Sequence, residues 1–149
     1  MYNKIQDTQQ KKNAYSDIPA FQLPDIDGNV ITESSLQKNK STLFLFFNPD
    51  CELCREEIKQ IKTNQEAFKS FQIVFFTDLP AESIKFFLTE ITFEPSFNMF
   101  FLIDEKEKLI TKMEVKGTPE SYIYNQNGKL IKRFNGPVKI ETLIKYLSE

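Results

Sequence analysis

The 149-residue chain contains no histidine and no tryptophan, and it has only two cysteines and four glycines. Histidine is the usual general base of serine and cysteine hydrolases and a frequent ligand of zinc and haem iron. Its absence removes these classes of chemistry in their usual form. A closed zinc site takes four Cys or His ligands, which two cysteines cannot supply. We therefore expect no metal site within a single chain.

Long hydrophobic runs and blocks of basic residues are also missing. The longest apolar runs, residues 43–47 and 99–103, are far shorter than the roughly 20 residues that span a bilayer. The 19 Lys and Arg residues are spread among 21 Asp and Glu residues, so the charge pattern of a phosphate-backbone binder is lacking. We expect no nucleic-acid partner and no membrane-spanning helix.

The chain begins with a polar segment, residues 1–17 (MYNKIQDTQQKKNAYSD). It has no apolar stretch of the kind found in a signal peptide. We expect residues 1–17 to form a flexible tether and residues 18–149 to form one domain. An attachment to a membrane would require a leader or anchor that has been removed.

Strand and helix patterns alternate along the domain. Buried strands are predicted for the apolar runs at residues 42–47, 72–77 and 100–104, and helices for residues 51–68, 81–91, 105–115 and 140–147. Turn sequences predict a hairpin within residues 18–30 and another around residues 121–134. This order indicates an α/β fold, with a central mixed sheet, helices on both faces and an N-terminal β-hairpin extension.

Both cysteines lie in the segment FNPDCELCR, residues 47–55, between a predicted strand and a predicted helix. With Asp50 as the N-cap, Cys51 opens the helix, where unpaired backbone N–H groups stabilise a thiolate. Cys54 lies nearly one turn later and deeper in the core, so it can attack a mixed disulfide formed at Cys51. Two buried inert thiols or a structural disulfide are the alternative, and the helix-opening position favours the redox pair.

Glu57 falls on the same face of this helix as Cys54, one turn further along. A buried carboxyl there would have a raised pKa and could exchange protons with Cys54. The residues alone leave open a second interpretation, in which Glu57 reaches the helix edge and has no role.

With these residues in place, the chain from about residue 18 onward resembles the thioredoxin-like superfamily. It is most similar to the bacterial thiol-disulfide oxidoreductases of the TlpA/ResA type, which are redoxins related to the AhpC/TSA proteins. Three segments carry the resemblance: FQLPDIDGNVITESSL, TLFLFFNPDCELCREEI and GTPESYIYNQNGKLIKRFNG. They resemble, in the family's order, its N-terminal hairpin, its Cys-x-x-Cys helix and its cis-proline hairpin.

The resemblance implies a role for each site residue. Cys51 would be the attacking cysteine and Cys54 the resolving one, while Glu57 matches a glutamate that family members carry. Thr118 and Pro119 would form the cis-proline loop that offers backbone groups to a partner chain. No cofactor beyond the Cys51–Cys54 disulfide is implied. The implied partners are protein disulfide or dithiol substrates and an upstream thiol-disulfide electron donor, at a periplasmic or otherwise extracytoplasmic location, with the cytoplasm as the alternative.

Two residues depart from the family pattern. Asp50 stands where Trp usually precedes the first cysteine, and Leu53 stands where Pro usually precedes the second. The acidic neighbours Asp50 and Glu52 disfavour a thiolate at Cys51. We therefore predict a less acidic Cys51 and a more reducing pair than in a Cys-Pro-x-Cys oxidase.

Other functions are less well matched. Peroxiredoxins need Pro-x-x-x-Thr-x-x-Cys, whereas Pro49 lies two residues before Cys51 with no threonine between it and Cys54. A copper-delivery protein of the Sco type usually has Cys-x-x-x-Cys and a distant histidine, and neither is present. A binding module that kept the fold without the chemistry stays an alternative. The preferred function is a reductase-leaning protein thiol-disulfide oxidoreductase.

Overall fold

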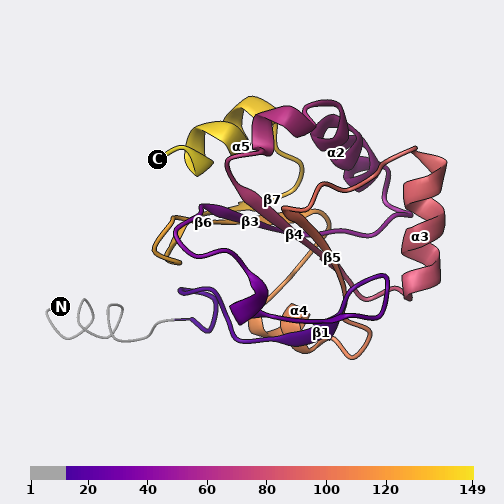
Figure 1. Ribbon diagram of the computed structural model, residues 1–149, viewed down its shortest axis with the longest axis horizontal. Helices are drawn as coiled ribbons and strands as arrows, with labels where there is room; N and C mark the ends of the chain where they lie inside the picture. Colours follow the sequence, from indigo (N-terminus) through magenta and orange to yellow (C-terminus); the bar gives the residue numbers. More distant parts are fainter. Residues whose placement is uncertain (1–12) are drawn as a thin grey trace, which may run out of the picture.

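The computed structural model describes residues 13–149, and a five-stranded sheet forms its centre (Figure 1). In spatial order the strands are β5 (Met99–Ile103), β4 (Gln72–Thr77), β3 (Thr42–Phe46), β6 (Glu120–Tyr124) and β7 (Leu130–Asn135). Strands β3, β4 and β5 are parallel, whereas β6 runs antiparallel to β3 and β7 antiparallel to β6. The mixed sheet predicted from the sequence is confirmed.

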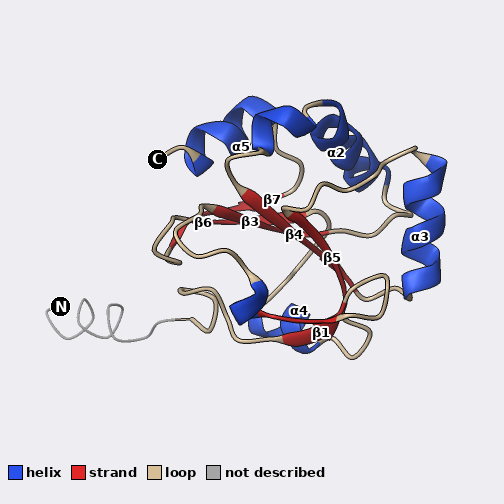
Figure 2. Cartoon of the chain, viewed as in Figure 1, coloured by secondary structure: helices blue, strands red, loops and turns tan. Residues whose placement is uncertain are grey.

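Helices and a hairpin cover the two faces of the sheet (Figure 2). One face packs against α2 (Glu52–Thr63), α3 (Ala81–Glu90) and α5 (Ile140–Leu147). The other packs against α4 (Lys108–Lys112) and the N-terminal hairpin of β1 (Gln22–Pro24) and β2 (Val30–Thr32). Two short 3-10 turns, Glu33–Ser35 and Gln65–Phe68, complete the elements. The predicted fold class, including the hairpin, is confirmed.

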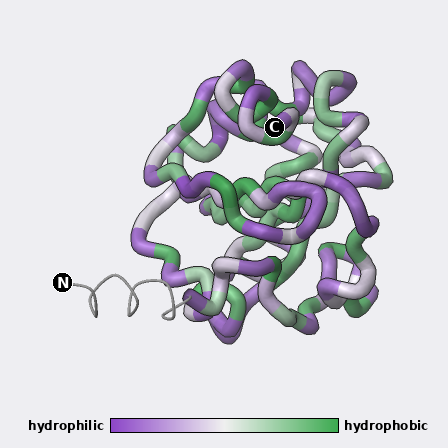
Figure 3. The backbone as a smooth tube through the Cα atoms, turned by 90° about the vertical axis from the view of Figure 1, so that its left-hand side faces the viewer, coloured by the Kyte–Doolittle hydropathy of each residue, from purple (hydrophilic) through white to green (hydrophobic). Residues whose placement is uncertain are grey.

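Coverage on both faces explains why the central strands are apolar except for Thr42, Gln72 and Thr77 at their ends. All five residues of β3 and all six of β4 are buried. Alternate residues point to opposite faces, so each strand contributes to two separate cores. In Figure 3, green hydrophobic stretches run through the interior of the tube, with purple hydrophilic stretches in front of them and along much of the outline. The sheet supports the loops that connect to the ends of its strands.

The start of α2 differs by one residue from the prediction. Cys51, not Asp50, is the N-cap, and it makes no side-chain capping bond. A turn formed by Asn48 accounts for the difference: the Asn48 side chain accepts from the Asp50 N–H at 2.8 Å, and the Asn48 carbonyl accepts from the Cys51 N–H at 2.9 Å. The expectation of an Asp50 cap was therefore wrong, and Cys51 lies at the junction of turn and helix.

The predicted helix at residues 105–115 is shorter in the structure, where α4 covers only Lys108–Lys112. The buried Asp104 carboxylate accepts from the N–H groups of Lys108 and Ile110 at 2.9 and 2.8 Å. Glu107 has a left-handed backbone with φ of 58°. These contacts form a turn before the helix, which residue periodicity alone does not reveal.

Part of the predicted tether packs on the domain. Tyr15 is buried, the Tyr124 hydroxyl donates to its carbonyl at 2.7 Å, and the Leu130 N–H donates to the Ser16 carbonyl at 2.9 Å. The folded part therefore begins before residue 18. Residues 1–12, the remainder of the predicted tether, lie outside the described residues.

Candidate functional site

The two cysteines lie where β3 ends and α2 begins. Cys51 is partly exposed, whereas Cys54 is fully buried in the core between the sheet and its helices. The Cys51 thiol donates to the Thr118 carbonyl at 3.9 Å, although 67 residues separate the two in the chain. The structure thus places the loop before β6 directly beside the exposed cysteine.

The surroundings of the two thiols move their pKa values in opposite directions. Burial opposes ionisation of Cys51, but hydrogen bonding by the Cys54 and Leu53 backbones, the Cys54 thiol and the Thr118 side chain outweighs it, so the pKa of Cys51 is lowered. Burial dominates at Cys54 and raises its pKa to about 12. Cys51 is therefore the more accessible and the more readily ionised of the two thiols, and Cys54 stays protonated at neutral pH.

This difference predicts selective alkylation. In the reduced protein at pH 7, iodoacetamide should modify Cys51 first, with Cys54 at least about 10²-fold slower because it is buried and protonated. Mass spectrometry of peptides from timed samples measures both rates. Comparable labelling of the two cysteines in the folded protein would contradict the assignment.

Glu57 is buried on the same face of α2 as Cys54, with 4% of its surface exposed. Its Oε1 accepts from the Val138 N–H at 3.2 Å, while Oε2 is buried without a hydrogen-bond partner among residues 13–149. Burial raises the pKa of Glu57 to about 7, although the Val138 N–H and the nearby Ser121 hydroxyl favour the charged form. The alternative in which Glu57 reaches solvent does not occur here.

A raised pKa at Glu57 also makes folding stability depend on pH. The pKa is 4.5 for an ordinary glutamate and about 7 here, so folding favours the protonated carboxyl. The associated stability, about 3 kcal/mol, is fully present below about pH 4.5, falls as the pH rises, and is lost above about pH 7. Glu57→Gln should remove this dependence and leave the protein more stable than wild type at pH 8.

Urea unfolding at several pH values measures this effect. Glu56→Gln is the matched control, since Glu56 is exposed on the neighbouring position of the same helix and should keep the wild-type profile. Parallel stability profiles for wild type and Glu57→Gln would show that Glu57 does not carry the raised pKa.

Thr118 and Pro119 lie in the loop at residues 116–119, which precedes β6. The Thr118–Pro119 peptide bond is cis, and the Pro119 carbonyl accepts from the Gly136 N–H at 2.8 Å. Together with Cys51, Cys54 and Glu57, these residues form one candidate site, where β3 ends and β6 begins. All five residues singled out in the sequence thus come from two segments that the fold brings together.

Two residues of the site were missed in the sequence. Ser121 is fully buried on the Glu57 side of β6, and its Oγ has no hydrogen-bond partner among the described residues. Glu120 is buried on the opposite side of the strand and bonds to the 116–119 loop. The alternation of strand residues directly after Pro119 could have indicated two inward-facing polar groups, one on each face.

Residues 13–149 contain neither a candidate metal-binding cluster nor a candidate membrane-spanning helix. In that part of the chain, no three His, Cys, Asp or Glu side chains are grouped so as to hold a metal ion. None of the helices there has the length and apolar character needed to cross a bilayer.

Comparison with known proteins agrees with this arrangement. The model of the AhpC/TSA family matches residues 15–133, most of the chain, and the protein therefore belongs to this family. Over 150 residues it is 24% identical to the thiol-disulfide oxidoreductase ResA of Bacillus subtilis, a match that covers 99% of this chain and 82% of ResA. The resemblance proposed from the sequence is confirmed.

Solved structures show the same fold at lower identity. StoA from Bacillus subtilis superposes with a TM-score of 0.71 at 20% identity, covering 90% of this chain and 99% of StoA. The peroxidoxin BcpB from Mycobacterium tuberculosis superposes with a TM-score of 0.76 at 14% identity, covering 89% and 94%. A thiol-disulfide oxidoreductase and a peroxidoxin are thus both similar to this chain. Similarity of fold therefore does not decide between the two activities, and the choice depends on the site residues.

Proposed function

We propose that this protein is a thiol-disulfide oxidoreductase that reduces disulfides of other proteins with its Cys51–Cys54 dithiol. The observation that carries the proposal is the pairing of an accessible Cys51, whose pKa is lowered, with a buried Cys54 one helical turn away. The match to ResA supports the same activity. No cofactor is required, since the two thiols supply both electrons.

In the first step the Cys51 thiolate attacks one sulfur of a substrate disulfide. A mixed disulfide forms between Cys51 and that sulfur, while the other substrate sulfur leaves as a thiolate and takes up a proton. The backbone of Thr118 lies beside Cys51 and offers hydrogen-bonding groups to the substrate chain. The N–H groups at the start of α2 stabilise the thiolate before attack.

In the second step Cys54 resolves the mixed disulfide. Its thiol proton passes to the Glu57 carboxylate, which lies one turn further along the buried face of α2. The Cys54 thiolate attacks the Cys51 sulfur, the Cys51–Cys54 disulfide forms, and the substrate leaves as a second thiolate that is protonated. Two electrons and two protons have then moved to the substrate, and an upstream dithiol restores the reduced protein.

Two residues exposed around Cys51 differ from those usual in the TlpA/ResA type. Asp50 and Leu53, at the positions where Trp and Pro are usual in the TlpA/ResA type, are both exposed beside Cys51. Substrates therefore meet one acidic and one apolar residue in place of an aromatic ring. We propose an extracytoplasmic location, supported by the resemblance to that type.

A peroxidase function has weaker support. The fold similarity to a peroxidoxin is strong, but the threonine that would hold a peroxide beside the attacking cysteine is missing from residues 47–55. Reduction of insulin disulfides, followed by turbidity with dithiothreitol as donor, tests the proposal against this rival. We expect insulin reduction without consumption of hydrogen peroxide; the reverse result would identify a peroxidase.

A further inference from the structure

The loop that faces Cys51 is held from behind by a buried carboxylate. Glu120 directly follows Pro119, with 2% of its surface exposed. Its Oε1 accepts from the backbone N–H groups of Lys116 and Gly117, both at 2.8 Å. The Glu120 side chain therefore binds the start of the 116–119 loop, next to Thr118, whose carbonyl contacts Cys51.

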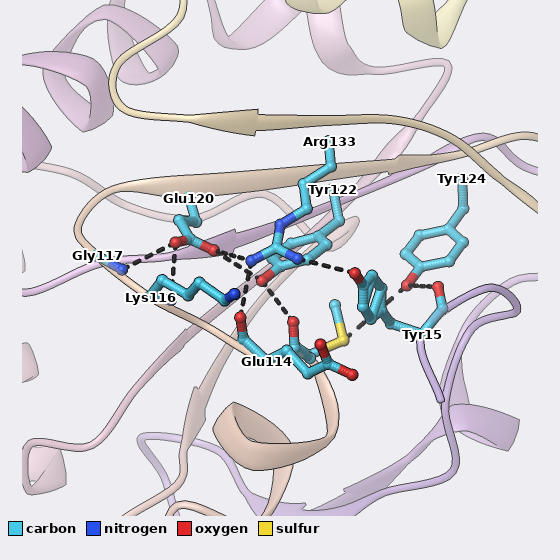
Figure 4. Close-up of polar contacts among 9 residues, drawn as sticks. Tyr15, Glu114, Lys116, Gly117, Glu120, Tyr122, Tyr124 and Arg133 are labelled. Carbon is cyan, nitrogen blue, oxygen red and sulfur yellow. Dashed lines mark hydrogen bonds and ion pairs between the residues drawn. The ribbon is translucent and has the colours of Figure 1, made fainter. Parts of the chain in front are cut away.

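The second oxygen of this carboxylate is clamped by an arginine (Figure 4). Arg133 lies on β7 and donates from Nη2 to Glu120 Oε2 at 2.8 Å. Its guanidinium group lies over the rings of Tyr15 and Tyr122, about 5 Å from each centroid, and donates to the Glu114 carbonyl at 2.7 Å. These contacts hold the Arg133 guanidinium group in place, and its ion pair in turn holds the Glu120 carboxylate.

The contacts form a continuous path from the sheet to the reactive thiol. Arg133 holds Glu120, Glu120 holds the N–H groups of the loop, and the loop presents the Thr118 carbonyl to Cys51 at 3.9 Å. We propose that Glu120, clamped by Arg133, is a positioning residue that aligns the 116–119 loop for binding of the substrate chain. The inference rests on the proposed exchange function.

All hydrogen-bond partners of the Glu120 carboxylate are donors, which suggests a substitution that tests its role. Its partners are the N–H groups of Lys116, Gly117 and Arg133, together with the Tyr122 hydroxyl at 2.9 Å, which is shared with the Met113 carbonyl. An amide at this position must direct its NH₂ group towards N–H donors, whichever way it is turned. Glu120→Gln therefore keeps the size of the side chain but disrupts either the loop contacts or the arginine clamp.

The test compares two disulfides with the pre-reduced protein. One is a peptide with an internal disulfide, which has a backbone for the loop to bind; the other is cystamine, which has none. Glu120→Gln should lower the rate constant for the peptide about 10-fold and leave the cystamine rate nearly unchanged, since misplacement by about 1 Å can cost up to 10²-fold. The ratio of the two rates is the readout, because a loss of folded protein lowers both equally.

Asp104→Asn is the matched control. Asp104 is also a buried carboxylate that accepts from two backbone N–H groups, but it holds the turn before α4 and not the 116–119 loop. It should leave the ratio unchanged. Tyr122→Phe, which removes one contact to Glu120, gives a milder second variant in case Glu120→Gln folds poorly, and we expect a smaller change in the same direction.

The outcomes separate this inference from the function on which it rests. A wild-type protein that reduces both disulfides, with the peptide-to-cystamine ratio lowered in the Glu120 and Tyr122 variants, supports it. An unchanged ratio in both variants overturns the positioning role while the exchange function stands. If the wild-type protein reduces neither disulfide, the exchange function fails, and the inference fails with it.

Discussion

Replacing Cys51 by serine should reduce the rate of disulfide exchange by at least about 10³-fold, to the background of the assay. A serine hydroxyl does not ionise near neutral pH, and removal of an enzyme's nucleophile can cost on the order of 10⁶-fold in turnover. Cys51 is the accessible thiol with the lowered pKa, whereas Cys54 is buried and protonated. The remaining cysteine therefore cannot replace the lost one.

Cys54→Ser gives the informative companion variant. Cys51 should still attack a substrate disulfide, but nothing resolves the mixed disulfide, so a covalent complex with one substrate molecule should accumulate and be visible by mass spectrometry. The assignment predicts a trapped complex for Cys54→Ser and none for Cys51→Ser. Trapping by Cys51→Ser, through Cys54, would show that the roles of the cysteines are reversed.

Glu57→Gln should slow the second step, formation of the Cys51–Cys54 disulfide, by about 10²- to 10⁴-fold, the usual contribution of a general base. Cys54, with a pKa of about 12, has almost no thiolate at neutral pH, so its attack depends on a base in the core. Glu57 is the buried carboxyl one turn away, with a pKa of about 7. The first step, attack by Cys51, should change little.

The rate of the second step should also depend on pH in a way that shows whether Glu57 acts as the base. Glu57 acts as a base only when ionised, so the wild-type rate of the second step should rise with pH up to about 7 and then level off. In Glu57→Gln the rate should rise with pH without that plateau. Rapid mixing followed by acid quenching measures the lifetime of the mixed disulfide. The exposed Glu56→Gln is the control, and an unchanged lifetime in Glu57→Gln would exclude a role for Glu57 as the base.

The sheet and the cysteine site could be predicted from the sequence because their patterns are local. The runs at residues 42–47 and 72–77 are apolar except for Thr42, Gln72 and Thr77 at their ends, as expected of strands covered on both faces. The spacing of Glu57 to Cys54 predicted that both lie on one face of the helix, while the choice between a buried and a solvent-reaching Glu57 side chain came from the structure. Such features depend on a few neighbouring residues and on the periodicity of one element.

Features set by individual hydrogen bonds of polar side chains, whether to nearby backbone or to another strand, could not be predicted from periodicity. Hydrogen bonds to Asn48 place the N-cap of α2 at Cys51 instead of Asp50. Hydrogen bonds to the Asp104 carboxylate form a turn ahead of α4, so the helix predicted from residue 105 begins only at Lys108. The role of Glu120 depends on Arg133, which lies 13 residues away on another strand. A lone glutamate after a proline has no sequence pattern that reveals such a partner.

The reduction potential of the Cys51–Cys54 pair tests the account most directly. The protein is equilibrated in dithiothreitol buffers of graded potential, and the free thiols are trapped and counted by mass spectrometry. We predict one reversible two-electron transition near the roughly −270 mV of thioredoxin, as expected for a reductase of protein disulfides. A value near the roughly −120 mV of a strong oxidant, or no reversible transition at any potential, would contradict the proposed function.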